Sequence, residues 1–263
     1  MKYPEDYINK VICGDALEEL KKLPDECIDC VITSPPYDNL RDYQGYSFDF
    51  KGIARELFRV IKIGGVVVWV VGDATINGSE TGTSFKQALY FKEIGFNLHD
   101  TMIWEKSTIP QQTFNRYQPF FEYMFIFSKG SPKTFNPLKE QKRYKDNRKI
   151  KNVHRNKSGK LQFGKPSPKE DKVIGNIWYI PTGGGITTKD KIAYDHPAIF
   201  PDKLVECHIT SWTNEGDLVI DPFNGSGTTT KMARSLKRNY IGIDISKEYC
   251  EIAQKRLAQE ILL

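Results

Sequence analysis

The feature that most constrains the fold lies near the C-terminus, where a strand, a glycine-rich turn, a helix and a second strand follow one another. The first strand is Leu-Val-Ile-Asp at 218–221, the turn is Pro-Phe-Asn-Gly-Ser-Gly at 222–227, and the second strand ends at Asp244. A helix that joins two neighbouring strands in this way is typical of parallel sheets. In open sheets of this kind, ligands bind beyond the carboxyl ends of the strands. The segment therefore predicts a ligand site at the turn.

The rest of the chain shows the same alternation of short apolar runs and helical stretches. We expect further strands at 10–13, 28–33, 66–71, 98–105, 122–128 and 177–180, and helices at 16–23, 50–61, 84–94, 201–213, 228–236 and 247–262. The β-branched run at 66–71 is typical of a central strand that is buried on both faces. With 263 residues, the chain can form one large α/β domain with an inserted lobe. We predict a mostly parallel sheet with helices on both faces.

A basic segment interrupts this alternation at 129–175, which has few aliphatic residues and no sustained periodicity. Residues 133–172 contain 14 Lys/Arg and 4 Asp/Glu, a net charge of +10 in a chain whose total is +5. Such runs are often no more than a solvated surface, but a basic segment on a mildly acidic body favours a polyanion partner. The side chains that we expect to bind phosphates are Lys142, Arg143, Lys145, Arg148, Lys149, Lys151 and Arg155.

Several classes of protein are disfavoured by the sequence. No apolar run reaches the length of a membrane span, and the N-terminus has no apolar signal region, so we expect a cytoplasmic protein. Cys27 and Cys30 form a Cys-x-x-Cys pair, but no second Cys or His pair stands at zinc-ligand spacing. We therefore expect reduced thiols and no metal.

The glycine turn has the residue types of a cofactor site. Gly225 and Gly227 allow the backbone to pass close to a ligand, and the N–H groups at Thr228 can meet a carboxylate. Asp244 follows Asp221 by 23 residues, where an acid can accept hydrogen bonds from two ribose hydroxyls. The turn lacks the third glycine of a dinucleotide site and the lysine of a P-loop, which favours the methionine zwitterion of S-adenosylmethionine. Taken alone, the segment also allows a plain tight turn.

A second motif, Ser34-Pro35-Pro36-Tyr37, directly follows the strand expected at 28–33. The amino nitrogen of a nucleobase is a poor nucleophile because its lone pair is delocalised into the ring. Two acceptors, the Ser34 hydroxyl and the Pro35 carbonyl, can hold its N–H bonds and localise that pair, while the prolines stiffen the turn. Tyr37 offers an aromatic face for a flipped-out base. We predict that this tetrapeptide is catalytic; a rigid surface turn is the alternative.

The two motifs together resemble those of the β-group amino DNA methyltransferases. Thr-Ser-Pro-Pro-Tyr at 33–37 precedes Asp-Pro-Phe-Asn-Gly-Ser-Gly-Thr-Thr at 221–229, which is the circularly permuted order of that group, and the similarity spans nearly the whole chain. The resemblance implies a seven-stranded, mostly parallel sheet in a single catalytic domain, 1–263, with a target-recognition insertion at 129–175. It also implies that the cofactor is S-adenosylmethionine.

The resemblance further implies which residues surround that cofactor. It places Asp244 at the ribose and Asp15 near the adenine amino group. The residues that it places along the methionine part are Asp221, Phe223, Gly225 and Gly227. Phe200, Pro201 and Lys203 precede the turn in the family pattern and are expected to wall the pocket. The full set of expected cofactor-binding residues is Asp15, Phe200, Pro201, Lys203, Asp221, Pro222, Phe223, Gly225, Gly227, Thr228 and Asp244.

The first residue of the tetrapeptide bears on the target base. In the family, Ser at this position is usual for cytosine N4 and Asp or Asn for adenine N6, so Ser34 favours cytosine and leaves adenine as the alternative. The sequence has no Pro-Cys dipeptide, which disfavours the covalent route to cytosine C5. A DNA-binding module that has lost catalysis is the alternative of another class; an RNA or protein methyltransferase fits the motif order poorly. The expected partner is double-stranded DNA with one base flipped out; a homodimer and a cognate restriction endonuclease stay open.

Overall fold

The computed structural model describes residues 2–36, 49–107, 115–141, 152–164, 171–196 and 198–259. The chain forms two compact units. The first comprises Met1–Asn136 and Asn176–Leu263, and the second is Pro137–Gly175. The second unit lies within the segment expected as an insertion, whereas residues 129–136 belong to the first unit.

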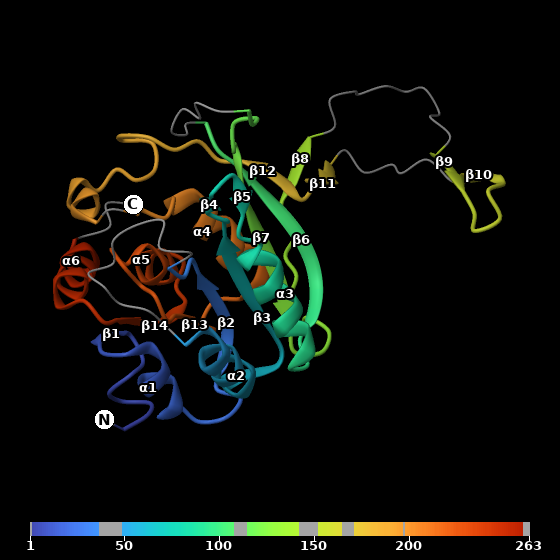
Figure 1. Cartoon of the computed structure of the whole chain (residues 1–263). Coiled ribbons are helices and arrows are strands. Elements are labelled where there is room, and N and C mark those ends of the chain that lie inside the picture. Colours follow the sequence, from blue (N-terminus) through green and yellow to red (C-terminus); the bar gives the residue numbers. More distant parts are fainter. Residues whose placement is uncertain are drawn as a thin grey trace. The chain divides into compact units, whose positions relative to one another are not determined.

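An eight-stranded sheet forms the centre of the first unit (Figure 1). In their spatial order the strands are β1 (Lys10–Cys13), β14 (Asn239–Asp244), β13 (Leu218–Asp221), β2 (Ile28–Thr33), β3 (Ile61–Val71), β7 (Phe121–Ser128), β6 (Asn97–Glu105) and β12 (Ile177–Tyr179). β7 runs antiparallel to β3 and β6, and every other neighbouring pair is parallel. The predicted fold class is confirmed. The sheet has one strand more than the seven expected, because the short β12 adds to the edge of β6.

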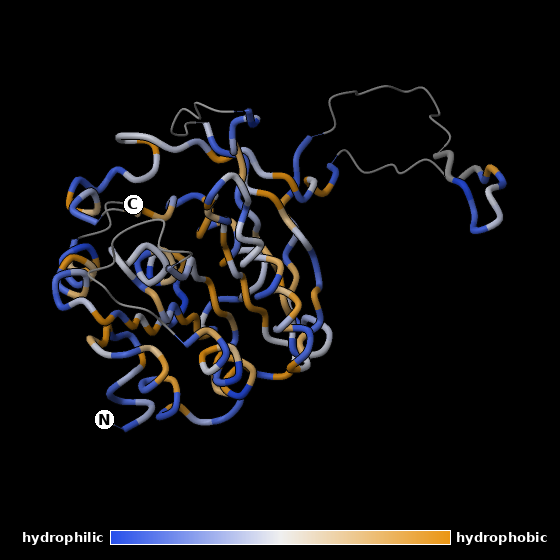
Figure 2. Tube along the Cα trace, in the orientation of Figure 1, coloured by the Kyte–Doolittle hydropathy of each residue, from blue (hydrophilic) through white to orange (hydrophobic). Residues whose placement is uncertain are grey.

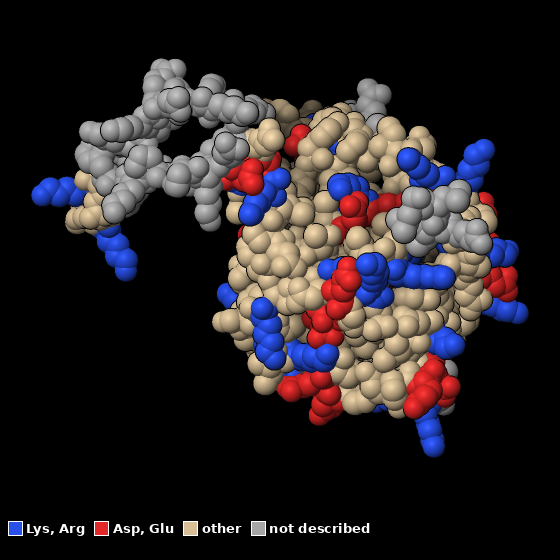
Figure 3. All heavy atoms as spheres, turned by 180° about the vertical axis from the view of Figure 1, so that it is seen from behind, with Lys and Arg blue, Asp and Glu red and all other residues tan. Residues whose placement is uncertain are grey.

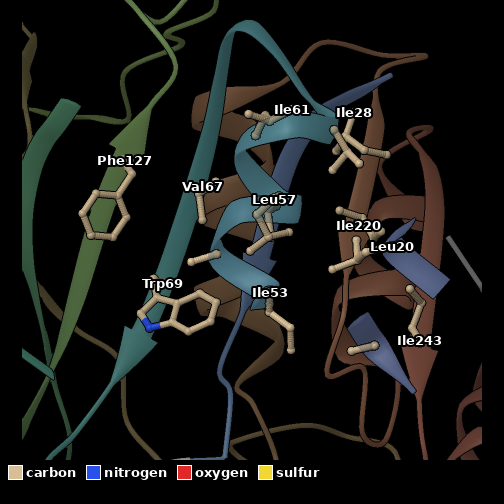
Figure 4. Packing of buried hydrophobic residues seen from close by; sticks show 14 of the residues in the cluster. Leu20, Ile28, Ile53, Leu57, Ile61, Val67, Trp69, Phe127, Ile220 and Ile243 are labelled. Carbon is tan, nitrogen blue, oxygen red and sulfur yellow. The ribbon is translucent and has the colours of Figure 1, made fainter. Parts of the chain in front are cut away.

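Helices cover both faces of this sheet. One face carries α1 (Ala16–Lys21), α2 (Phe50–Val60) and α3 (Thr83–Glu93); the other carries α4 (Asp202–Trp212), α5 (Thr228–Ser235) and α6 (Lys247–Ala258). Successive strand residues point to opposite faces. In β3, Val67 and Trp69 therefore join the cluster under α1–α3, and Val68 and Val70 join the cluster under α4–α6. Figure 4 shows part of the first cluster, and Figure 2 shows the apolar strands between more polar helices.

Helix α2 illustrates how the sequence specifies one of these packing elements. The Asp49 side chain caps its first turn by accepting a hydrogen bond from the Gly52 N–H at 3.0 Å. Ile53 and Leu57 stand four residues apart on one face and are buried against the sheet. Burial of a side chain such as Leu57 stabilises the fold by about 1.5–3 kcal/mol. The helix ends at Val60, and β3 begins at the next residue, Ile61.

The remaining elements are short. The first unit also contains the hairpin of β4 (Thr75–Ile76) and β5 (Ser79–Glu80) and the 3-10 helix η1 (Lys191–Asp195). The second unit contains two antiparallel pairs, β8 (Lys139–Gln141) with β11 (Asp171–Val173) and β9 (Asn152–Arg155) with β10 (Leu161–Gly164).

All five cysteines lie in described segments and are free thiols. The described residues contain no cluster of three or more His, Cys, Asp or Glu side chains that could hold a metal ion. In the same part of the chain, no helix has the length and hydrophobicity needed to cross a membrane.

Candidate functional site

The two sequence motifs meet at the carboxyl edge of the sheet. β2 and β13 are parallel neighbours, so Thr33 and Asp221 end adjacent strands at the same edge. The Thr33 hydroxyl donates a hydrogen bond to Asp221 Oδ1 at 2.6 Å, across a sequence separation of 188 residues. The two motifs, far apart in the sequence, therefore lie at the same edge of the sheet.

The tetrapeptide begins directly after β2. Pro35 is buried, and Ser34 and Pro36 are half-buried. Because proline fixes its own φ and lacks an N–H, the backbone here cannot extend the sheet by further donated hydrogen bonds. Tyr37 lies outside the described residues. The described part of the motif thus begins one residue after Thr33, whose hydroxyl is bonded to the last residue of β13.

Asp221 is the central side chain of this edge. Its Oδ1 also accepts the Phe223 N–H at 3.0 Å, and its Oδ2 accepts the Thr229 hydroxyl at 2.7 Å. Burial raises the pKa of Asp221 to about 6, although these hydrogen bonds act in the opposite direction; the charge of Asp244 raises it slightly further. The carboxylate therefore points into the protein, toward the end of β2 and the start of α5, beneath the glycine turn.

The glycine turn packs closely against α6 and against His196. Gly225 and Gly227 have φ values of 49° and 82°, in the left-handed region that favours glycine. A Cβ on Gly227 would lie 2.6 Å from Ala253 Cβ in α6, and one on Gly225 would lie 2.9 Å from the His196 ring. From the sequence, we expected these glycines to allow close approach by a ligand. The structure shows that close approach by α6 and by His196 already demands them.

Asp244 ends β14 beside the turn. Its Oδ2 accepts the Gly225 N–H at 2.8 Å and its Oδ1 accepts the Ser246 N–H at 2.9 Å. Burial raises the pKa of this carboxyl, and the two N–H groups oppose that rise. Each carboxylate oxygen can accept a further hydrogen bond. The carboxylate is thus fixed in place and retains capacity for a ligand's hydroxyl groups.

Asp15 lies close to Asp244 through the pairing of β1 with β14. The N–H of Gly14 donates to the Asp244 carbonyl at 2.9 Å, and Asp15 follows immediately. Its exposed side chain caps α1 by accepting the Glu18 N–H at 3.0 Å. The two acids expected at the adenosine part of the cofactor are therefore brought to one edge.

Other residues expected to bind the cofactor lie around the start of α4 and just after β13. Pro201 is buried at the start of α4, and Phe200 packs against the apolar cluster under α4–α6. Lys203 is largely exposed and pairs with Glu206 on the same helix, at 3.1 Å. Pro222 is buried and Phe223 is half-buried, and both follow β13.

A buried arginine beneath the turn was missed by the sequence argument. Arg256 of α6 is fully buried, and its Nη1 donates to the Ser226 carbonyl at 2.9 Å and to the Thr228 hydroxyl at 3.0 Å. Its Nε bonds Asp190 at 3.1 Å and its Nη2 bonds Asp202 at 3.2 Å. The available signal was its position: Arg256 falls three and four residues after buried Ala253 and Ile252, on the apolar face of α6.

The basic insertion is described only in part. Arg155 ends β9, and its guanidinium donates to the Gly159 carbonyl at 3.0 Å within the β9–β10 hairpin. The other expected phosphate-binding side chains lie outside the described residues: Lys142, Arg143, Lys145, Arg148, Lys149 and Lys151. On the face of the first unit in Figure 3, the Lys and Arg side chains of the described residues are interspersed with Asp and Glu, so these residues form no single-sign patch there.

Comparisons with known proteins agree with this arrangement. Residues 28–255 match the family model described as DNA methylase, of the N6/N4 type. The orphan methyltransferase M.BamHII of Bacillus amyloliquefaciens is 59% identical over 247 residues, which cover 92% of this chain and 93% of that protein.

Solved structures show the same fold. The Thermus thermophilus protein TTHA0409, complexed with S-adenosyl-L-methionine, has a TM-score of 0.66 and 25% identity, covering 95% of this chain and 93% of that one. The cytosine-N4-specific PvuII DNA methyltransferase has a TM-score of 0.70 and 23% identity, covering 96% and 87%. The second likeness concerns the fold alone.

Proposed function

The chain belongs to the N6/N4 DNA methylase family and is a site-specific DNA methyltransferase, and on that premise we propose that it methylates the exocyclic N4 of cytosine. The observation that carries the site assignment is the Thr33–Asp221 hydrogen bond, which joins the tetrapeptide to the cofactor turn. Ser34 as the first residue of the tetrapeptide favours cytosine, with adenine N6 as the alternative.

The residues present fit S-adenosylmethionine. The Asp244 carboxylate can accept hydrogen bonds from the two ribose hydroxyls, and the first turn of α5 leaves N–H groups for the methionine carboxylate. Phe223, in the turn that follows β13, is a half-buried aromatic residue. When bound, this cofactor supplies an electrophilic methyl carbon. The support from relatives is that one solved neighbour, 25% identical, is complexed with the same molecule.

Ser34 and Pro35 would act on the amine. The serine hydroxyl and the proline carbonyl each accept one N–H bond of the amino group, which draws the nitrogen toward tetrahedral geometry and localises its lone pair. The methylated ammonium is acidic enough to lose its proton without a strong base. The gain in rate would come chiefly from alignment of the amine with the methyl carbon.

The insertion is proposed as the DNA-binding region. Phosphate contacts by its Lys and Arg side chains would position the duplex, and counterion release makes such binding weaker as salt rises. Tyr37 is proposed as the stacking surface for the flipped-out base. A homodimer and a cognate endonuclease stay predictions from the resemblance.

Nucleoside analysis tests the proposed base. DNA methylated by the purified protein is digested to nucleosides and analysed by mass spectrometry. We expect N4-methylcytosine; N6-methyladenine would instead establish the alternative. If tritiated cofactor labels no DNA under any condition, the chain is a binding module and not an enzyme.

Two variants separate the roles of the two motifs. Ser34→Ala should lower the transfer rate with little change in cofactor affinity, since it removes one acceptor for the amine. Asp244→Ala should chiefly raise the cofactor dissociation constant, because it removes the ribose partner. Equal effects of both variants on cofactor affinity, measured by calorimetry, would show that Ser34 has been misplaced.

A further inference from the structure

The bond between Thr33 and Asp221 stands where the two halves of the proposed site meet. Thr33 is the last residue of β2 and is fully buried, and Ser34 follows it directly. Asp221 is the last residue of β13, and the cofactor turn follows it directly. One hydrogen bond of 2.6 Å therefore joins the residue before Ser34, the proposed acceptor for the amine, to the residue before the glycine turn, the proposed cofactor site.

The Asp221 carboxylate distributes its hydrogen bonds between these two sides. Oδ1 accepts from the Thr33 hydroxyl and from the Phe223 N–H, and Oδ2 accepts from the Thr229 hydroxyl at the start of α5. The same Thr229 hydroxyl lies 3.3 Å from the Ile32 carbonyl in β2. A single rigid group thus fixes the end of β2, the first residues of the turn and the first turn of α5 relative to one another.

This arrangement is costly as a purely structural device. Burying a carboxylate carries a desolvation penalty that a pair of apolar side chains would avoid. β2 and β13 are already joined by backbone pairing, at Cys30–Val219 and Val31–Ile220, so the carboxylate is not needed to hold the two strands together. A buried acid at this junction is explained if its two directional oxygens set the geometry of the strand ends and the turn.

We propose that Thr33 is a positioning residue for methyl transfer, whose hydroxyl acts through Asp221 to hold Ser34 and Pro35 at the correct distance from the cofactor turn. The proposal rests on the function proposed above. Alignment of two reacting groups is sensitive to displacements of about 1 Å, which can cost on the order of a hundredfold in rate. Loss of this hydroxyl should therefore slow transfer without a matching loss of affinity for either substrate.

The ionisation of Asp221 provides a second readout. The groups that face its carboxylate are the hydroxyls of Thr33 and Thr229 and the N–H of Phe223, and the nearby charge is that of Asp244 at the end of β14. Both hydroxyls favour the charged form. Removing one of them should raise the pKa of Asp221 further. We expect protonation of Asp221 to slow transfer, so the fall in rate at acid pH (the acid limb of the rate profile) should move to higher pH.

The test compares Thr33→Val with Thr33→Ser and with Thr213→Val. Valine has the shape of threonine without its hydroxyl, and serine restores the hydroxyl. Thr213 is the matched control, since it is also fully buried and hydrogen-bonded, to the Ile209 carbonyl at 2.6 Å, at the end of α4. Single-turnover transfer to DNA, cofactor and DNA dissociation constants, and the pH profile are measured for each full-length variant.

We expect Thr33→Val to lower the single-turnover rate by about tenfold or more, with each dissociation constant changed by less than about threefold. Its acid limb should move to higher pH, and Thr33→Ser should recover most of the rate. Thr213→Val should keep the wild-type rate and profile. If Thr33→Val does not fold, Thr229→Val removes the donor at the other carboxylate oxygen and must show the same rate loss.

A wild-type rate in Thr33→Val, or a loss matched by Thr213→Val with no shift of the acid limb, would overturn the positioning role. Failure of the proposed function is distinguishable, because it would show in the wild-type protein. Absence of transfer by the wild type removes the function and the positioning role with it. Transfer to adenine corrects the base, and the same comparison of variants then decides the role of Thr33.

Discussion

Two buried polar clusters hold the same glycine turn, and they differ in how charge is compensated. On one side, the partners of Asp221 among the described residues are two hydroxyls and one N–H. On the other, Arg256 and Lys231 face the carboxylates of Asp190 and Asp202. Burial raises the pKa of Asp221 to about 6. Burial also acts to raise the pKa of Asp190, but the hydrogen bonds from Lys231 and Arg256 outweigh it and lower that pKa.

This contrast teaches that burial alone does not decide how a carboxylate behaves. Where cations compensate the charge, the acid stays ionised and its ion pairs persist. Where only neutral donors surround it, the acid titrates close to neutral pH and responds to the loss of one donor. Two clusters thus stabilise the glycine turn: an ionic cluster on the α6 side, and on the β2 side Asp221 with its neutral donors, which titrates.

The largest expected effect comes from the ionic cluster. Arg256→Met should lower the free energy of unfolding by about 3–5 kcal/mol, because Asp202 and Asp190 lose their shared buried partner. Urea unfolding followed by circular dichroism measures this. Lys237→Met, which breaks the exposed Lys237–Glu215 pair, is the control and should cost less than about 1 kcal/mol. Similar losses in both variants would remove the contrast between a buried and an exposed charge.

The next effect is the pH dependence of the titratable cluster. The pKa of Asp221 is raised from 3.8 to about 6 on folding, so its ionisation disfavours the folded state. Its contribution to stability is fully present below about pH 4 and is lost as the pH rises through about 6, by roughly 3 kcal/mol in total. Unfolding free energies of the wild type and Asp221→Asn between about pH 4 and 7.5 should show this difference.

The ionic cluster should behave with the opposite sign. Because the pKa of Asp190 is lowered, its stabilising contribution is present above about pH 4 and is lost as the pH falls through the folded value. Asp190→Asn should therefore differ from the wild type most at neutral pH and least in acid. If Asp221→Asn and Asp190→Asn changed the unfolding free energy with the same pH trend, the two carboxyls would not differ in how their charge is compensated.

The next effect tests how closely the turn packs on α6. Gly227→Ala should cost about 2–4 kcal/mol, because its Cβ would meet Ala253 at 2.6 Å in addition to the strain of a positive φ. Gly216 has a φ of 87° and open space around its Cβ position, so Gly216→Ala measures the φ strain alone. The difference between the two variants gives the packing contribution. No difference would mean that the turn is free to move away from α6.

The smallest effect concerns the rim of the ionic cluster. Thr188→Val removes a hydroxyl that donates to Asp202 at 2.7 Å and lies 3.4 Å from Arg256. We expect a loss of about 1 kcal/mol in unfolding free energy, with transfer kinetics close to those of the wild type. A large loss of transfer rate would show that this side of the turn also sets reaction geometry, as proposed for Thr33.

Much of the sheet and both site motifs were predictable from the sequence. The strand at 218–221, its glycine turn and the tetrapeptide after 33 each have a local residue pattern that does not depend on the rest of the fold. The limit of the insertion was not predictable. Residues 129–136 are mostly polar and lack periodicity, yet main-chain bonds such as Lys133 N–H to the Gly64 carbonyl join them to the first unit. Such bonds leave no mark on residue type.

The buried bonds of Thr33 and Arg256 were missed for a related reason. A threonine at the end of a strand and an arginine in a helix are both common, and their importance comes from partners far away in the sequence. Asp221 stands 188 residues after Thr33, and Asp190 stands 66 residues before Arg256. Only the order of the strands in the sheet brings these groups together.

The most direct test of the account is a crystal structure of the protein with duplex DNA and a non-reactive analogue of S-adenosylmethionine. We expect the ribose of the analogue at Asp244, its amino-acid part over the Gly225–Gly227 turn, and the amino group of a flipped-out cytosine within hydrogen-bonding distance of Ser34 Oγ and the Pro35 carbonyl. A cofactor bound at another edge of the sheet, or a target base that does not reach Ser34, would contradict it.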